Sequence, residues 1–215
     1  MTQASEDLRQ KLLAIARAMN GMGLNQATSG NLSVRCDDGF LITPSALAYQ
    51  DCTPADVVWL DCSGQPKDEA QQRKPSSEWR MHRDIYRHHP QAGCILHAHS
   101  PYCSVLACLE RPIPPFHYMV AVAGGDTIRC APYATFGTQE LSDRVIEALR
   151  ERRAALLAHH GMICCAADLD RVLALVIEVE NLARVYVLAL QVTEPPLLST
   201  EQMTAVLHRF QEYKA

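Results

Sequence analysis

The chain has 215 residues, 48% of them hydrophobic and 20% charged, and its formal net charge is -4. This length suits a single domain over residues 1–215, and the composition is that of an ordinary globular protein with a sizeable core. Because the balance is acidic and no run of Lys and Arg occurs, a nucleic-acid-binding role is excluded.

The first half of the chain is predicted to open with a helix and to continue as a hairpin. Ser5 can cap a helix whose apolar face runs from Leu8 to Met19, and Gly21 and Gly23 end it. Apolar alternation, and the turn residues that interrupt it, predict the elements that follow. They are strands over 31–35 and 40–43, a strand over 57–61, a loop over 67–75, and a helix from Ser76 to about His88.

The second half alternates strands and helices. The expected elements are a strand over 94–99, a helix over 101–109, strand-like segments over 117–125 and 127–132, a helix over 138–152, two strands between 155 and 166 that Gly161 separates, a long helix over 168–191 and a last helix near 199–211. The hairpins indicate antiparallel or mixed pairing. We therefore predict an α/β fold of three layers, α/β/α, around a mainly antiparallel central sheet.

Cysteine usage and the apolar segments bear on where the protein works. The nine cysteines are dispersed without a C-x-x-C pair, and several lie in apolar runs, where Cys acts as a small hydrophobic residue. We therefore expect reduced thiols in a cytoplasmic protein. The N-terminus lacks a basic segment followed by an apolar one, so no secretory signal is expected. The apolar-rich stretch 169–190 is too polar to span a bilayer, so we expect no membrane role.

The sequence CILHAHS, residues 94–100, places two histidines in an apolar run. Residues i and i+2 of a strand point to the same face, so His97 and His99 project together while Leu96 and Ala98 face the core. Two imidazoles on one face can bind one metal ion. Each can equally be a separate histidine with hydrogen bonds of its own, and the pair alone does not decide between these alternatives.

A third metal ligand is offered by the sequence AHHG. A catalytic zinc takes about three protein ligands and keeps one position open. Adjacent residues of a strand face opposite ways, so only one of His159 and His160 can reach the metal, and the spacing does not say which. Three imidazoles suit Zn²⁺, and they also accept Co²⁺, Ni²⁺ or Mn²⁺.

The stretch KPSSEWRMH adds hydroxyl groups and a carboxylate. Ser76 and Ser77 lie where a helix is expected to begin, and the free N–H groups of a helix start bind anions such as phosphate. Glu78 follows in the first turn, where an acidic residue is also typical of an ordinary helix start. The loops ATSGN (27–31) and TPSA (43–46) are two further candidate anion sites.

Six motifs, taken in their order and spacing, carry a resemblance to a known family. They are GLNQATSGNLSVR, DGFLITPSA, KPSSEWRMH, LHAHS, PIPPFHYMVAVAGGDTIRCAPYATFGTQEL and LLAHHGMI. On these motifs the chain resembles the class II aldolase/adducin family over nearly its whole length. The resemblance implies the head fold of that family, in agreement with the three predicted layers.

The resemblance implies roles for individual residues. It implies zinc held by His97, His99 and His160, with Glu78 as the general acid/base near the metal, or as a fourth ligand when no substrate is bound. It implies that the substrate phosphate is bound by Gly30, Asn31, Ser45, Ala46, Ser76 and Ser77. Ala46 stands where family members often have glycine, so a methyl group must fit beside the phosphate.

The resemblance also implies a fourfold-symmetric homotetramer with active sites at subunit interfaces. In the family a tyrosine reaches the site from a neighbouring subunit, and Tyr118 matches that position. Tyr213, in the terminal FQEY, would be a second tyrosine near the aldehyde end of the substrate. The tail after Tyr213 is shorter than in relatives, so the aldehyde specificity does not follow from the resemblance.

The implied reaction is the reversible cleavage of a ketose 1-phosphate to dihydroxyacetone phosphate and a small aldehyde. L-Fuculose 1-phosphate, 5-deoxyribulose 1-phosphate and methylthioribulose 1-phosphate are candidate substrates that differ only at the aldehyde end. The four lysines lie outside apolar runs, which fits a metal-dependent aldolase better than a Schiff-base aldolase.

Other functions are known on the same scaffold. A ribulose-phosphate 4-epimerase shares the metal triad but usually carries Asp where this chain has Glu78. A sugar-phosphate dehydratase or decarboxylase is a further alternative, and formation of dihydroxyacetone phosphate separates both from the aldolase. A non-enzymatic adducin-like module need not keep the metal ligands, so their presence here disfavours it.

Overall fold

The computed structural model describes residues 3–68 and 71–212. Seven strands form one sheet in the order β3-β2-β1-β4-β7-β6-β5. They are β1 (Asn31–Cys36), β2 (Gly39–Ile42), β3 (Val58–Asp61), β4 (Cys94–Ala98), β5 (Arg129–Ala131), β6 (Ala154–Leu157) and β7 (Gly161–Ala166). All neighbouring strands are antiparallel except β5 and β6, which are parallel. The prediction of a mainly antiparallel sheet is confirmed.

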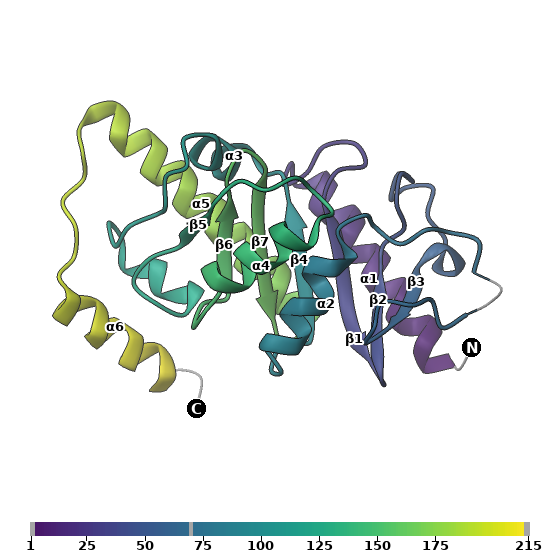
Figure 1. The fold of residues 1–215 in the computed structure, drawn as a ribbon. Coiled ribbons are helices and arrows are strands. Elements are labelled where there is room, and N and C mark those ends of the chain that lie inside the picture. The colour runs from purple at the N-terminus through teal and green to yellow at the C-terminus, as the bar shows by residue number, and fades with distance from the viewer. Residues whose placement is uncertain (1–2, 69–70, 213–215) are drawn as a thin grey trace.

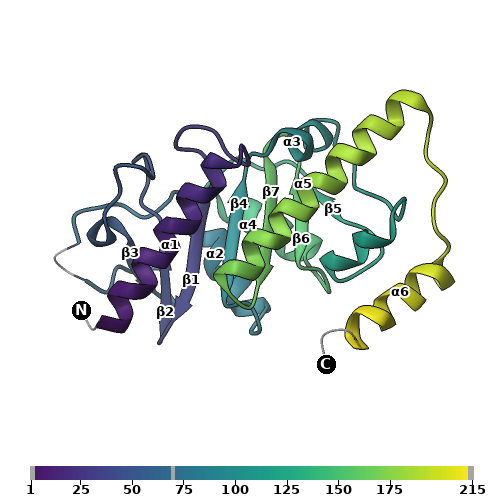
Figure 2. The ribbon, with the colours of Figure 1, turned by 180° about the vertical axis from the view of Figure 1, so that it is seen from behind.

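Helices cover both faces of this sheet. They are α1 (Gln3–Gly21), α2 (Trp79–His88), α3 (Pro101–Cys108), α4 (Gln139–Ala148), α5 (Leu169–Val192) and α6 (Thr200–Glu212), with short 3₁₀ helices η1 (Pro54–Asp56) and η2 (Tyr118–Ala123). Figure 2 shows α1 and α5 crossing one face, and Figure 1 shows α2 and α4 on the other. Alternation along β4 supplies both cores, because Leu96 packs with the first face and Ile95 with the second. The predicted α/β/α layering is confirmed.

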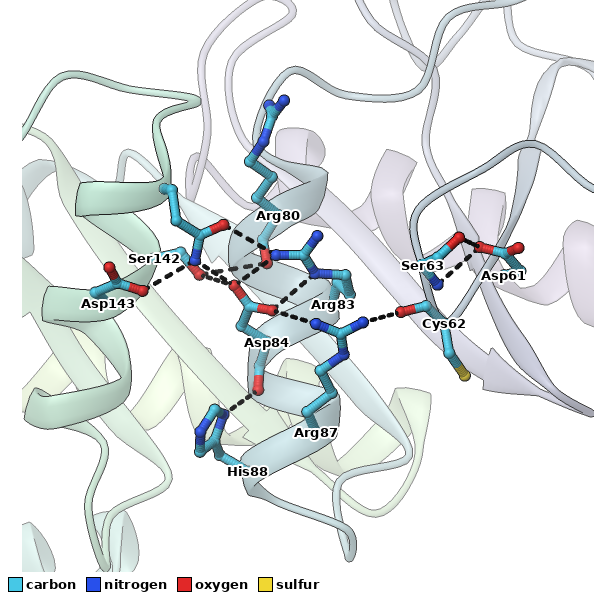
Figure 3. Close-up of polar contacts among 11 residues, drawn as sticks. Asp61, Cys62, Ser63, Arg80, Arg83, Asp84, Arg87, His88, Ser142 and Asp143 are labelled. Atoms are coloured by element: carbon cyan, nitrogen blue, oxygen red, sulfur yellow. Dashed lines mark hydrogen bonds and ion pairs between the residues drawn. The ribbon is translucent and has the colours of Figure 1, made fainter.

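The two helices of the second face are joined by polar contacts as well as by apolar packing (Figure 3). Asp84 of α2 accepts hydrogen bonds from Ser142 Oγ (2.8 Å) and Gln139 Nε2 (2.7 Å) of α4. Its neighbour Arg83 donates to the same carboxylate from Nε (2.7 Å) and Nη2 (3.0 Å). These contacts fix α2 against α4, and α2 carries Glu78 at its N-cap.

One predicted strand is wrong. The segment 117–125, whose apolar run was expected to be strand-like, instead forms η2 and ends at Gly124, which has a φ of 96°. Its apolar residues Val120, Ala121 and Ala123 are buried in the core under α5, so tertiary packing, and not sheet pairing, explains their hydrophobicity.

Three helix boundaries also differ from the prediction. The helix expected to begin at Ser76 begins at Trp79, and the first helix begins at Gln3, ahead of its predicted cap Ser5. The helix expected over 138–152 ends at Ala148. The chain then turns, and Glu151 has a φ of 59°, which an α-helix cannot accommodate.

The C-terminal helix α6 lies at one end of the molecule, beyond an extended segment that follows α5 (Figures 1 and 2). Leu198 N of this segment donates to Pro115 O (2.8 Å), and α6 itself packs on η2 with Met203 buried. Among the described residues, no helix is both long enough and apolar enough to cross a membrane.

The register of the central strands gathers the predicted site residues at one end of the sheet. Asn31, the first residue of β1, is paired with His97 near the end of β4. Ala98 is paired with Met162 near the start of β7. The segments that precede β1, follow β4 and precede β7 therefore meet at this end, as antiparallel pairing requires.

Candidate active site

Three imidazoles converge at this end of the sheet. His97 lies in β4, His99 directly follows it, and His160 precedes β7. Their ring centroids are 4.7–4.9 Å apart, and one nitrogen from each lies within 4.8 Å of the other two. His97 Nε2 and His99 Nε2 are 3.0 Å apart. Such a cluster of nitrogen ligands can hold one divalent metal ion.

The structure decides between the two histidines that the sequence left open. Leu157 is paired with Gly161, so His159 and His160 lie in the turn between β6 and β7 and not on a strand. His159 has a φ of 54°, and its Nε2 lies 3.1 Å from Glu110 Oε1 at the surface. The left-handed residue thus redirects the chain so that only His160 joins the cluster.

The three imidazoles are neutral, as metal ligands must be. Burial, followed by the neighbouring imidazole of His99, lowers the pKa of His97 to about 3. Burial, followed by the neighbouring imidazole of His97, lowers the pKa of His160 to about 4, and burial also lowers the pKa of His99. His97 Nδ1–H donates to Met162 O (2.8 Å), which leaves the Nε2 lone pair facing the cluster.

Glu78 faces the same cluster. Its Oε2 lies 3.2 Å from His97 Nε2 and accepts a hydrogen bond from Asn31 Nδ2 (2.9 Å). Its Oε1 lies 3.5 Å from His160 Nε2 and is buried without a hydrogen-bond partner among the described residues. A buried carboxylate oxygen without a partner is costly, and a cation beside it would remove that cost. The donor set therefore fits a divalent metal.

A cavity of about 380 Å³ opens beside the imidazoles and Glu78. All six residues expected to bind phosphate line it: Gly30, Asn31, Ser45, Ala46, Ser76 and Ser77. They come from three separate segments of the chain. Two of these segments are joined by backbone hydrogen bonds, because Ser45 N donates to Lys74 O and Ser76 N donates to Thr43 O. Tyr133 and Phe136 also line the cavity, and their residue types gave no signal for a site. His159, the histidine that does not join the cluster, lines it as well.

Two backbone positions in the cavity wall require a left-handed conformation. Gly30 has a φ of 71°, and a Cβ there would approach His97 O to 2.7 Å. Ala46 has a φ of 57°, which is strained for a residue with a side chain. This conformation explains why glycine is suited to the position of Ala46.

Tyr118 does not line this cavity in its own chain. Tyr118 is 52% exposed and lines a second cavity, of about 790 Å³, between η2 and α6. Tyr213 lies outside the described residues.

Reasoning from the sequence missed two buried groups next to the site. His82 of α2 is fully buried and bonded to Asn31 and Ser33. Glu180 of α5 accepts hydrogen bonds from Ser100 Oγ (2.6 Å) and from two N–H groups in the first turn of α3, directly after His99. Each of these two residues is a polar residue within the apolar face of a helix, and this pattern in the sequence could have indicated a buried polar group.

Comparison with known proteins places the chain in a family. Residues 10–187 match the family described as Class II Aldolase and Adducin N-terminal domain. The chain is 50% identical to a 5-methylthioribulose-1-phosphate/5-deoxyribulose-1-phosphate aldolase of Rhodospirillum rubrum, over 96% of this chain and 92% of that one. It is 45% identical to an L-fuculose phosphate aldolase of Escherichia coli O6:H1, over 96% and 95%. A solved structure of an L-fuculose 1-phosphate aldolase superposes with a TM-score of 0.91 at 39% identity, covering 95% and 96%.

The chain therefore belongs to the class II aldolase and adducin family. Its histidine cluster and its similarity to aldolases along almost the whole chain make it an enzyme of that family, a metal-dependent carbon–carbon lyase. The predicted resemblance is confirmed.

Proposed function

We propose that the protein reversibly cleaves a ketose 1-phosphate to dihydroxyacetone phosphate and a small aldehyde, with a zinc ion held by His97, His99 and His160. L-Fuculose 1-phosphate and 5-deoxyribulose 1-phosphate are the substrates we favour, because relatives named for these activities are 45% and 50% identical to the chain, respectively. The observation that carries the proposal is the unpartnered Glu78 Oε1 beside three neutral imidazoles.

The reaction leaves an electron pair on the dihydroxyacetone phosphate fragment when the carbon–carbon bond breaks. His97, His99 and His160 would hold a zinc ion without reducing its positive charge, because the imidazoles are neutral, and the ion would supply a Lewis acid for the negative charge that develops. Cobalt or manganese could supply the same chemistry from this donor set.

Glu78 is proposed to move the proton at the enediolate carbon. Its carboxylate lies between the imidazoles and the cavity, and it is held by Asn31. In the cleavage direction Glu78 gives a proton to the enediolate carbon, and in the synthetic direction it removes that proton. Its burial excludes water from competing with this transfer.

The substrate phosphate is proposed to lie among Gly30, Asn31, Ser45, Ala46, Ser76 and Ser77. The Ser77 hydroxyl, the Asn31 amide and the backbone of the left-handed Gly30 and Ala46 offer donors around one cavity. Local donors are needed because the chain as a whole is acidic and its overall field does not attract an anion.

We propose that the enzyme is a homotetramer and that Tyr118 serves the active site of a neighbouring subunit. Its exposure, and its distance in the fold from the cavity of its own chain, support this role. In synthesis the phenol gives its proton to the aldehyde oxygen and becomes a phenolate, and in cleavage the phenolate takes the proton of the substrate hydroxyl and becomes the phenol again. Tyr213 is proposed to lie near the aldehyde end.

We also propose that the enzyme works in the cytoplasm. All nine cysteines are free thiols, and five of them are buried. A reducing compartment preserves such thiols, and buried cysteines need no partner because they pack as small apolar groups.

The test is release of dihydroxyacetone phosphate from L-fuculose 1-phosphate and from 5-deoxyribulose 1-phosphate, side by side, with and without a chelator. Chelator-sensitive release that returns on adding Zn²⁺ is expected, and the ratio of the two rates ranks the aldehydes. No release from either substrate, by protein shown to hold metal, would refute the proposed substrates and favour an epimerase, dehydratase or decarboxylase.

A further inference from the structure

A row of buried polar side chains lies between β1 and α2, beside the proposed catalytic carboxylate. It consists of Asn31 and Ser33 from β1, and of Glu78, His82 and Tyr86 from the α2 segment. Two residues of a strand advance about 6.6 Å and four residues of a helix about 6 Å. The two spacings match. The two β1 side chains therefore interleave with the three side chains of the α2 segment, which are four residues apart.

Hydrogen bonds join the five side chains end to end. Asn31 Nδ2 donates to Glu78 Oε2 (2.9 Å), and Asn31 Oδ1 is bonded to His82 Nε2. His82 Nδ1 lies 2.7 Å from Ser33 Oγ, which in turn lies 2.8 Å from Tyr86 Oη. The row therefore runs without a break from the metal site into the core between the sheet and α2.

Each of these bonds has only one consistent direction. An ionised carboxylate only accepts, so the amide of Asn31 must turn an N–H group toward Glu78 and its oxygen toward His82. His82 must then carry its proton on Nε2. Full burial, followed by the nearby imidazole of His97, lowers the pKa of His82 to about 3, so the ring is neutral and its Nδ1 accepts from the hydroxyl of Ser33. Ser33 Oγ is left to accept from Tyr86.

We propose that His82 is a positioning residue for the reaction, whose Nε2–H fixes the amide of Asn31 and thereby holds the Glu78 carboxylate with Oε2 toward His97 and Oε1 toward His160. Asn31 provides the only hydrogen bond to the Glu78 side chain among the described residues, so the carboxylate has no other such restraint. Asn31 keeps its second N–H group for the cavity that it lines. The inference rests on the proposed role of Glu78.

Three variants separate positioning from packing. His82→Gln keeps an N–H donor at this position, whereas His82→Leu keeps apolar bulk and removes the donor. Tyr86→Phe is the matched control, because it removes a buried hydroxyl at the far end of the row and leaves the bonds of Asn31 intact.

We expect His82→Leu to lower kcat by about ten- to a hundredfold with KM within about threefold of wild type. His82→Gln is expected to stay within about threefold of wild-type kcat, and Tyr86→Phe within about twofold. Metal content should be unchanged in all three. Equal losses in His82→Gln and His82→Leu, or a fall in metal content that accounts for the loss, would overturn the proposal.

A second measurement does not depend on the folding of any variant. Nitrogen NMR of the histidine rings in the wild-type protein should show His82 as the neutral Nε2–H tautomer throughout the pH range in which the protein is folded. The Nδ1–H tautomer would overturn the proposal, because Asn31 would then face an acceptor.

A double-mutant cycle and one further variant complete the test. In an Asn31→Ala background, His82→Leu should change kcat by less than about twofold, because its effect passes through Asn31. Glu78→Gln is measured in parallel by exchange of the dihydroxyacetone phosphate carbon-bound proton with solvent. Normal exchange in Glu78→Gln would overturn the role of Glu78 and the positioning with it. Lost exchange in Glu78→Gln, together with full kcat in His82→Leu, would overturn only the positioning.

Discussion

Replacing Asp84 by Asn should destabilise the fold at the α2–α4 contact that supports the active-site helix. The carboxylate is 5% exposed and accepts from Arg83, Gln139 and Ser142 (Figure 3). The amide of Asn brings its own N–H donors toward these donors and leaves the guanidinium of Arg83 without its charge partner. The substitution therefore breaks both the hydrogen bonds and the ion pair while it keeps the volume.

The pKa of Asp84 gives the magnitude. Burial by itself raises this pKa, but the hydrogen bonds from Arg83, Gln139 and Ser142 outweigh burial and lower it from 3.8 to about 2. A carboxyl group with a lowered folded-state pKa contributes stability above its unfolded-state pKa, and that contribution is lost as the pH falls from 3.8 toward 2. A shift of this size corresponds to about 2 kcal/mol, so Asp84→Asn should cost about 2–3 kcal/mol near neutral pH.

Urea unfolding at one fixed protein concentration measures this cost, because assembly would otherwise change the apparent stability. Asp143→Asn is the matched control, since Asp143 is exposed and its one hydrogen bond among the described residues is accepted from Gln139 Nε2, at 2.9 Å. The control should cost less than about 0.5 kcal/mol. The difference in unfolding free energy between wild type and Asp84→Asn should become smaller below about pH 4. A difference under about 0.5 kcal/mol at neutral pH, or one that does not change with pH, would refute the reasoning.

Four further outcomes are expected. His97→Ala should lose bound metal and cleavage together, as elemental analysis and the cleavage assay would show; retained metal would contradict the site. Tyr118→Phe should slow carbon–carbon cleavage more than enediolate proton exchange, and equal slowing of both would exclude the proposed role. Gly30→Ala should lower unfolding free energy by about 1–3 kcal/mol, because its Cβ meets backbone at a φ of 71°. Glu180→Gln should lower the unfolding free energy by about 1–2 kcal/mol, because it weakens the hydrogen bonds at the start of α3. Urea unfolding measures both variants, and a change below about 0.5 kcal/mol in Gly30→Ala or in Glu180→Gln would contradict the estimate for that variant.

Local periodicity was enough to predict most of the elements. Strand alternation placed His97 and His99 on one face, and the structure brings their nitrogens to 3.0 Å. Hairpin signals around residues 37–39 predicted the antiparallel pair β1–β2, which is present. The segment 117–125 failed because an apolar run has the same appearance in a buried 3₁₀ helix as in a strand, and only its packing under α5 distinguishes the two.

The sequence by itself determined the candidate ligands, since imidazoles at strand spacing and a glutamate at a helix start are local patterns, and the order of six motifs implied their roles through a family resemblance. The tertiary structure decided which side chains meet. It chose His160 over His159 through a turn with a left-handed residue, and it buried His82 against Asn31. These choices depend on the register between β1, β4 and β7 and on how α2 lies across the sheet, and such contacts join residues more than forty positions apart. Local propensity carries no information about pairings at that distance, because they are set when the whole core packs.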